Sequence, residues 1–282
     1  MSDLKPISST NKSIAVLPFV NMSADPENEY FSDGITEEII NALTTVKGLK
    51  VIARTSSFAF KNKNIDVRSI GKQLGVSTVL EGSVRKVKNR VRITAQFVNT
   101  DDGTHYWSKN FDRDLEDIFA LQDEISLHIA DQIRENFGHL TIQEHLIEAP
   151  TQSIEAYDLY LKGRYQHLMW DGQGIANAVE LYEKSVTVDP SFPLPYFGLA
   201  YSYAMYGSWG NNRALLKLSE DNLRKGLTLD KQSYIGYFSK ATLSFWGRWD
   251  FINGHKAFLK AIELNPSYTE AEEGLCELYT AI

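Results

Sequence analysis

The feature that most constrains this 282-residue sequence is a short pattern that recurs three times in its second half. In each copy a small residue is followed four positions later by a large apolar residue, and three positions after that by another small residue. The copies are Ala178, Tyr182 and Ser185; Ser219, Leu223 and Gly226; and Gly254, Phe258 and Ala261. These spacings place the three members on one face of an α-helix. A helix that recurs in this way predicts a stacked array and not a closed core.

Each of these helices is preceded by a second helix with an aromatic, leucine, small, aromatic pattern. The pattern is clear at Tyr196, Leu199, Ala200 and Tyr203, is looser at Phe238, Ala241, Thr242 and Phe245, and begins again at Leu275, Cys276 and Tyr279. Such helix pairs resemble the tetratricopeptide repeat. The resemblance implies three full repeats and the first helix of a fourth, with residues 211–218 as an inserted linker. Cys276 occupies the small-residue position and is expected to be a buried packing residue.

The first half of the chain mixes strand and helix patterns. β-Branched and apolar runs predict strands over residues 13–20, 49–53, 76–87, 91–99 and 105–111. Helices are expected after Ser32 or Asp33, from about Asp66 to the stop at Gly75, and after Asp114. The order β-α-β-α-β-β-β-α describes a small domain with a mixed sheet.

Three segments of this half resemble, in the right order, the TolB-N-terminal-like (FlgO-like) domain. They are SIAVLPFVNMSADPENEYFSDGITEEIINAL, VIARTSSFAFKNKNIDVRSIGKQLGVSTVLEGSV and VRITAQFVNTDDGTHYWSKNFDRDLEDIFALQDEIS. The resemblance covers residues 12–138 and implies an adaptor or sensing role with no known catalysis. In that family the domain often lies between a signalling or output module and a tetratricopeptide array. Such modules include class III adenylate cyclase, winged-helix and serine/threonine kinase domains, and none is visible in this sequence.

The predicted fold class is therefore a small α/β domain with a mixed sheet, followed by an all-α tetratricopeptide helical-hairpin array. We expect a flexible tail over residues 1–12, the TolB-N-like domain over 13–140, a linker over 141–152 and the repeats over 153–282. A lone half-repeat leaves an apolar face uncapped. We therefore expect the chain either to be cut from a longer protein or to form a homo-oligomer through its C-terminal half-repeat.

Composition and motifs exclude several classes of function. The net charge of −7 and the pI near 5.4 disfavour nucleic-acid binding. No apolar run approaches the ~18 residues of a membrane span, which predicts no membrane insertion, and a cytoplasmic location is expected. The single cysteine excludes a multi-cysteine zinc site. The nucleotide, zinc-protease and serine-hydrolase motifs are missing, so we expect no catalytic residues, no metal and no cofactor.

Two groups of residues are candidates for binding a partner. By register, six side chains face the concave groove of the array, where aromatic residues serve as anchors: Tyr160, Arg164, Phe197, Tyr201, Leu243 and Trp246. Packing between repeats is an equally plausible role for them. A second group forms a basic patch for an anionic partner, at Arg85, Lys88, Arg90 and Arg92. A solvated strand pair is the favoured reading of this patch.

These observations predict a non-catalytic module that mediates protein–protein interaction. We expect it to be the regulatory part of a larger bacterial signalling protein, adenylate cyclase-like or a transcriptional regulator. The alternative is a sensor that binds a small molecule in a cleft near residues 33–36 or 54–64 and relays occupancy through the repeats. Adenylate cyclases of class III need paired aspartates on a separate domain, so the chain alone is expected to be inactive. Ser32, Asp33 and Gly34 are also a candidate anion site, although an N-cap is the commoner role.

Overall fold

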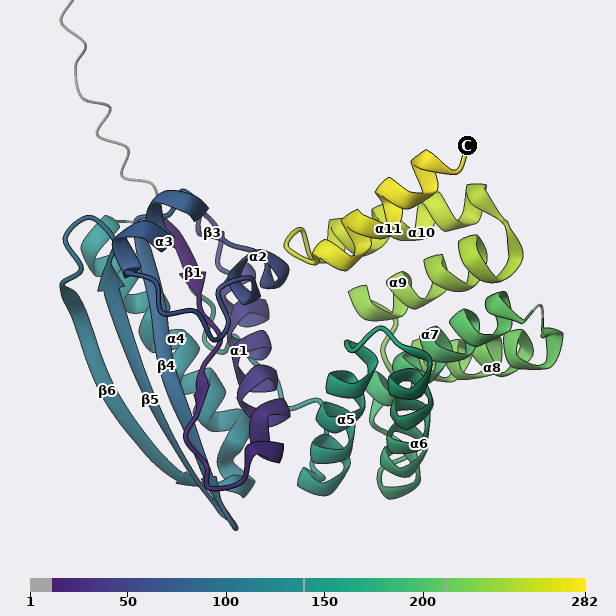
Figure 1. The fold of residues 1–282 in the computed structure, drawn as a ribbon, viewed down its shortest axis with the longest axis horizontal. Helices are drawn as coiled ribbons and strands as arrows, with labels where there is room; N and C mark the ends of the chain where they lie inside the picture. Colours follow the sequence, from purple (N-terminus) through teal and green to yellow (C-terminus); the bar gives the residue numbers. More distant parts are fainter. Residues whose placement is uncertain (1–11, 139, 211) are drawn as a thin grey trace, which may run out of the picture.

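The computed structural model describes residues 12–138, 140–210 and 212–282, and consists of a mixed α/β unit followed by an array of helical hairpins (Figure 1). This is the fold class that the sequence predicts. The expected tail over residues 1–12 lies, apart from Lys12, outside the described residues.

The sheet of the α/β unit has the order β3-β1-β4-β5-β6, with β2 also paired to β4. β1 pairs in parallel with β3 and β4, whereas β4, β5 and β6 form an antiparallel meander, so the sheet is mixed as expected. The strands are β1 (Ser13–Val16), β2 (Val20–Asn21), β3 (Lys50–Val51), β4 (Thr78–Val87), β5 (Arg90–Asn99) and β6 (His105–Asp114).

The first predicted strand is divided in two. Pro18 has no N–H to donate to a neighbouring strand, and it lies between β1 and β2. The N–H of the next residue, Phe19, turns away from the sheet and donates to the hydroxyl of Thr36 at 3.0 Å. The interruption therefore ties the strand segment to the helix that covers it.

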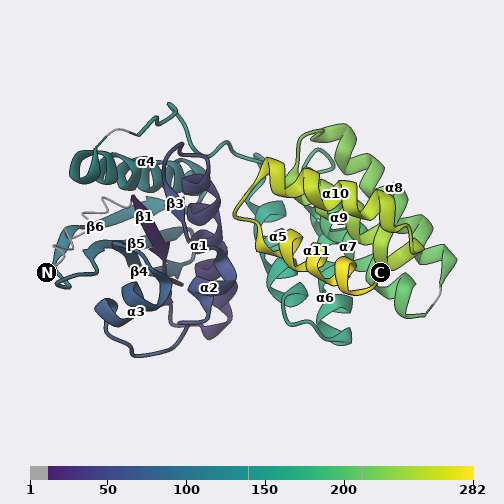
Figure 2. The same cartoon turned by 90° about the horizontal axis from the view of Figure 1, so that it is seen from above.

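The helices of this unit are α1 (Glu29–Thr44), α2 (Arg54–Phe58), α3 (Val67–Leu74) and α4 (Ile118–Phe137). Figure 2 shows α4 and α3 on opposite faces of the sheet, with α1 on the side that faces the array. The predicted ends of α3 are confirmed, because Asp66 caps its first turn and Gly75 ends it with φ 65°. The sequence patterns did not predict α2.

The predicted start of α1 is wrong. A 3₁₀ turn (Pro26–Asn28), capped by the Asp25 side chain, leads directly into the helix at Glu29. Ser32 and Asp33 therefore lie inside α1, where both are buried. Neither the N-cap nor the anion site expected of them exists in this structure, because no helix begins there.

The array contains three helical hairpins and a final single helix within the described residues. They are α5 (Ile154–His167), α6 (Gly172–Val188), α7 (Pro193–Trp209), α8 (Arg213–Leu229), α9 (Tyr234–Thr242) continued by a π-helix (Leu243–Gly247), α10 (Phe251–Leu264) and α11 (Thr269–Thr280). The expected inserted linker at 211–218 is wrong, because Asn212 caps α8 and the chain is helical from Arg213.

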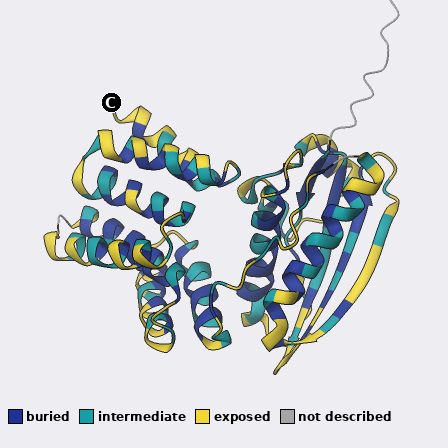
Figure 3. Cartoon of the chain, turned by 180° about the vertical axis from the view of Figure 1, so that it is seen from behind, coloured by how far each residue is buried: buried dark blue, intermediate teal, exposed yellow. Residues whose placement is uncertain are grey.

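The two parts share one apolar core. A single cluster contains Ile35 of α1, Ile118 of α4 and Tyr157 and Leu161 of α5. α1 is buried over most of its length because it lies between the sheet and the array (Figure 3). The segment before α5 is also fixed, since the carboxylate of Asp123 accepts the backbone N–H groups of residues 146 and 147 at 2.7 and 3.0 Å.

Candidate functional site

The candidate site is the interface between the α/β unit and the array, and α5 forms its centre. Leu161 of α5 packs so closely on Gly34 of α1 that a Cβ at Gly34 would lie 2.8 Å from Leu161 Cδ2. The ring of Tyr157 lies edge-on to Phe119 of α4, with 4.6 Å between centroids, and its hydroxyl accepts a hydrogen bond from Gln122 at 3.3 Å. The first helix of the array is therefore packed into the α/β unit.

One half-buried carboxylate at this interface is shared by both parts of the chain. Asp158 of α5 accepts hydrogen bonds from the Tyr30 hydroxyl at 2.6 Å and from Lys86 Nζ at 2.7 Å. Lys162, one turn along α5, lies 2.8 Å from its other oxygen. Burial would raise the pKa of Asp158, but the hydrogen bonds from Lys162, Lys86 and Tyr30 outweigh it and lower that pKa.

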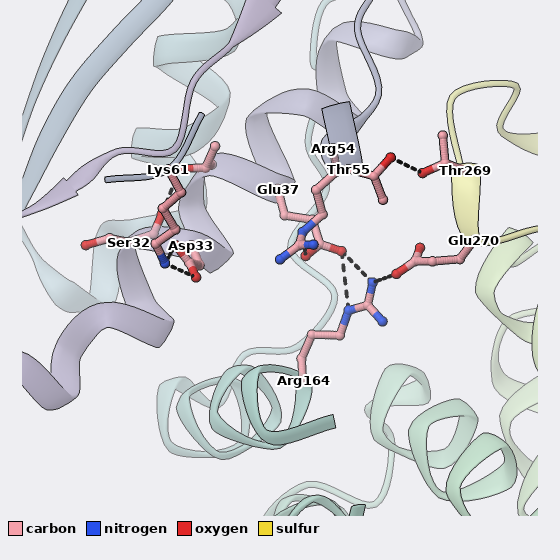
Figure 4. A network of polar contacts seen from close by, with 10 residues as sticks. Ser32, Asp33, Glu37, Arg54, Thr55, Lys61, Arg164, Thr269 and Glu270 are labelled. Carbon is pink, nitrogen blue, oxygen red and sulfur yellow. Dashed lines mark hydrogen bonds and ion pairs between the residues drawn. The ribbon is translucent and has the colours of Figure 1, made fainter. Parts of the chain in front are cut away.

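A second network connects three separate elements through Arg164 (Figure 4). Its Nη2 donates to Glu37 Oε1 of α1 at 2.9 Å and to Glu270 Oε1 of α11 at 2.5 Å. The other oxygen of Glu37 lies 3.0 Å from Nε of Arg54, at the start of α2. Beside this network the hydroxyl of Thr55 donates to that of Thr269 at 3.3 Å. The array therefore curves until its last helix returns to the α/β unit.

The charges of this network balance only in part. Burial would raise the pKa of Glu37, but the guanidinium groups of Arg164 and Arg54 outweigh it and lower that pKa. The neighbouring carboxyl of Glu38 has no ion-pair or hydrogen-bond partner among the described residues. Burial, and next the charge of Glu37, raise its pKa to about 7, although Arg164 opposes this. Asp33, one turn earlier, is ion-paired to Lys61 at 2.6 Å.

The structure separates the six predicted groove residues into three groups. Phe197, Tyr201 and Leu243 are buried, with exposed fractions of 4% or less, because helices of neighbouring repeats pack on them. This burial corrects the expectation that they are open to a partner. Tyr160 is buried and Arg164 is engaged at the interface with the α/β unit. Trp246 keeps a partly exposed ring, edge-on to Tyr201 at 6.4 Å.

The predicted basic patch is neutralised in part. Arg90 and Arg92 on β5 each pair with Asp112 on β6, at 2.5 and 2.7 Å. Arg85 donates to the backbone carbonyl of Met22 at 3.1 Å. Lys88 lies at the β4–β5 turn with φ 52°. Cross-strand ion pairs therefore engage two of the four predicted patch residues, Arg90 and Arg92, and these two share the carboxylate of Asp112.

The expectation of a buried Cys276 is wrong. The equivalent position in α7, Ala200, is fully buried, and its carbonyl accepts a hydrogen bond from Ser219 of α8. Cys276 of α11 is exposed because no described helix covers that side of α11. Tyr279, on the same helix, has an exposed fraction of 53%.

Sequence reasoning missed Glu37, Glu38, Asp158 and Glu270 as parts of one site. Arg164 stood out through its register, but its partners lie 127 and 106 residues away in the sequence. No local pattern connects such positions. Among the residues that the structure describes, no group of three or more His, Cys, Asp or Glu side chains could hold a metal ion. Within the same residues, no helix is both long and apolar enough to cross a membrane.

Comparison with known proteins finds a family model and a curated relative that each match part of the chain. The model of the family described as "HilA/YgeH-like transcriptional regulator, second domain" matches residues 10–127. A protein of Rhizobium meliloti (strain 1021) named "Putative adenylate cyclase 3" is 44% identical over 190 residues, covering 67% of this chain and 32% of that protein. The chain therefore spans about a third of the length of this curated relative.

Solved structures with a similar fold each cover less than half of the chain. The first TPR domain of human RPAP3 is 19% identical, covers 47% of this chain and 94% of its own, and has a TM-score of 0.36. The lipoprotein GNA1162 from Neisseria meningitidis is 21% identical, with coverages of 36% and 80% and a TM-score of 0.32. The LpoB C-terminal domain from Salmonella enterica is 16% identical, with coverages of 37% and 83% and a TM-score of 0.31.

Proposed function

We propose that this chain is a non-catalytic regulatory module of a larger bacterial signalling protein, which works in the cytoplasm and binds a protein segment. Its parent is adenylate cyclase-like or a transcriptional regulator. The module consists of a TolB-N-like domain over residues 13–140, a linker over 141–152 and tetratricopeptide repeats over 153–282. The similarity to a protein named as an adenylate cyclase and the match to a transcriptional-regulator family support this assignment.

The observation that carries the proposal is the position of Arg164. This buried guanidinium lies between a carboxylate of the α/β unit and a carboxylate of the last helix of the array. A change in the curvature of the array moves Glu270 relative to Glu37, and so changes the contacts of the α/β unit. A regulatory module needs such a physical connection between the surface that binds a partner and the part that is attached to an output.

Peptide selection on the intact chain tests this function. Random displayed peptides are selected on the immobilised protein, and the affinity of the selected sequences is measured by calorimetry. We expect saturable binding in the micromolar range (roughly 1–100 μM) and no turnover of ATP. Failure to select any binding peptide, or ATP turnover that a single point substitution abolishes, would contradict the proposal.

Trp246 is the residue of the predicted groove that we retain as a proposed partner contact, since its ring is partly exposed. Trp246→Ala is expected to lower the affinity of the chain for the selected peptides that bind in the groove. Trp249→Ala is the matched control, because this tryptophan is 70% exposed at the following turn. Equal affinities of both variants would remove Trp246 from the site.

A small-molecule sensor is the second candidate, and one cavity favours it. A pocket of about 430 Å³ lies between the loop after α2 and the polar face of β4 and β5. Lys61, Glu29 and Gln96 are among its polar lining residues. A thermal-shift screen with metabolites and nucleotides tests this function, and stabilisation that Gln96→Leu removes would favour it over peptide binding.

We also propose that the chain self-associates through α11. Tyr279 of α11 and Ile282, two residues after the helix ends, are exposed, at 53% and 78%. Sedimentation at increasing protein concentration tests this contact. Tyr279→Ser should shift the distribution toward the monomer, and an unchanged monomer at all concentrations would contradict it.

A further inference from the structure

A second cavity, which we call the α1–array cleft, lies between the α/β unit and the array. Its volume is about 320 Å³, and it is lined by α1, by residues 146–150 before α5, and by the segment that joins α8 to α9. Both parts of the chain therefore contribute walls, and an occupant would contact both at once.

All the charged side chains that line this cleft are acidic. Glu37, Glu38, Glu148 and Asp230 are among its lining residues, and no lysine, arginine or histidine of the described chain is. Glu37 is already paired with Arg54 and Arg164, and Asp230 accepts the backbone N–H of Gln232 at 3.0 Å. Glu38 and Glu148 have no ion-pair partner among the described residues.

Glu38 is an uncompensated carboxyl on the α1 wall of the cleft. Its position on α1, beside Glu37 and among buried residues, raises its pKa to about 7. The ionised form therefore lacks sufficient positive charge around it, since Arg164 is committed to Glu37 and Glu270. A cation in the cleft would supply that charge.

The remaining walls suit a guanidinium on a polypeptide. The rings of Tyr160 and Tyr234 line the cleft, and a guanidinium packs on tyrosine rings while it pairs with a carboxylate. The amide side chains of Asn41 and Gln232 can bond to a peptide backbone. Leu146 provides apolar surface for a neighbouring side chain.

We propose that the α1–array cleft binds an arginine side chain of a partner protein segment, with Glu38 as its carboxylate and Tyr160 and Tyr234 as its aromatic walls. This inference rests on the proposed function, because it names the chemistry of the segment that the module binds. It adds a site that bridges the α/β unit and the array, separate from the groove position at Trp246.

A peptide array with matched pairs tests the site. Each random sequence is present once with a central arginine and once with citrulline, which has the same shape and no charge. The intact chain is applied, and the strongest pairs are measured in solution by fluorescence anisotropy. We expect arginine forms to bind at least about tenfold more tightly than citrulline forms.

Three variants define the outcome. Glu38→Gln should abolish the preference for arginine, and Glu148→Gln should reduce it. Glu180→Gln removes a carboxylate from the exposed face of α6 and should leave the preference unchanged. Thermal melting of each variant verifies that it is folded, and the isosteric Glu38→Gln change fills the same space.

The results separate this inference from the proposed function. Peptides that bind without preference for arginine, or a preference that survives Glu38→Gln, would overturn the inference and leave the module a peptide binder. If N-acetylarginine amide alone competes as strongly as the whole peptide, the site takes a small cation and the inference is also wrong. If no peptide of either form binds, the proposed function itself fails.

Discussion

Nη2 of Arg164 lies 2.9 Å from Oε1 of Glu37, so a side chain of the first array helix is ion-paired to one in the middle of α1. The two residues belong to different parts of the chain, and both side chains are largely shielded from solvent, with exposed fractions of 17%. The same nitrogen also contacts Glu270. This one guanidinium therefore connects α5 to both α1 and α11.

Arg164→Met is expected to destabilise the chain by about 3 kcal/mol, because the shielded carboxylate of Glu270 loses its partner and Glu37 keeps only Arg54. Urea unfolding measures the loss. Arg224→Met is the control, since Arg224 forms an exposed pair with Asp221 and its side chain is 73% exposed. A loss no larger than that of the control would show that the Arg164 pairs contribute little to stability.

Gly163→Ala and Gly198→Ala are each expected to destabilise the array by about 1–3 kcal/mol. The Tyr182 ring lies between these glycines, and a Cβ would meet it at 2.6 Å from Gly163 and 2.5 Å from Gly198. This clash opposes the gain in helix propensity, which is about 1 kcal/mol. Gly172→Ala is the control for thermal unfolding, because nothing lies within 4 Å of its added Cβ. Stabilisation in all three variants would contradict the packing described.

Glu38 makes stability fall as the pH rises. Its pKa is raised from 4.5 to about 7 in the folded chain, so between these values the folded state binds more protons than the unfolded state. The favourable contribution of Glu38 to the free energy of unfolding is complete at low pH and is lost as the pH rises through about 7. Relative to Glu38→Gln, wild-type stability should fall by about 2 kcal/mol from about pH 5 to about pH 8. Unfolding free energies at both pH values test this, and a constant difference would contradict it.

His167 has the opposite effect at acidic pH. Burial, and next the charge of Arg164, lower its pKa from 6.5 to about 3. The unfolded chain therefore binds a proton below about pH 6.5 that the folded chain excludes, and stability falls as the pH falls. Between about pH 7.5 and about pH 5, the free energy of unfolding of His167→Gln should fall by about 2 kcal/mol less than that of wild type. His255→Gln, at a partly exposed histidine of α10, serves as control, and equal slopes for both variants would contradict the prediction.

Much of the fold follows from local patterns in the sequence. The turn at Lys88, the caps of α3 at Asp66 and Gly75 and the small-aromatic-small pattern around Tyr182 each act within a few residues. The errors in the predicted bounds of strands and helices also have local causes. Pro18 divides a strand that its apolar neighbours would continue, and the 3₁₀ turn capped by Asp25 leads into α1 earlier than a cap at Asp33 would.

The candidate site could not be predicted in the same way. Arg164, Glu37 and Glu270 meet only after the array has curved through three hairpins and returned to α1. In the sequence, Glu38 cannot be told apart from an ordinary surface glutamate. Its surroundings in the fold come from α5 and from the segment before it. The basic cluster around Arg90 shows the reverse, because Asp112 on the next strand pairs with two of its arginines and reduces the apparent patch.

The position of α5 also sets how this protein can be divided and recombined. A helix whose inner residues complete the core of the preceding unit cannot be exchanged as part of the array alone. Recombination between relatives at residue 150 would leave Gly34 and Phe119 facing an unmatched helix. A viable crossover would lie after α5, so the α/β unit and its first array helix are expected to be inherited together while the later hairpins vary.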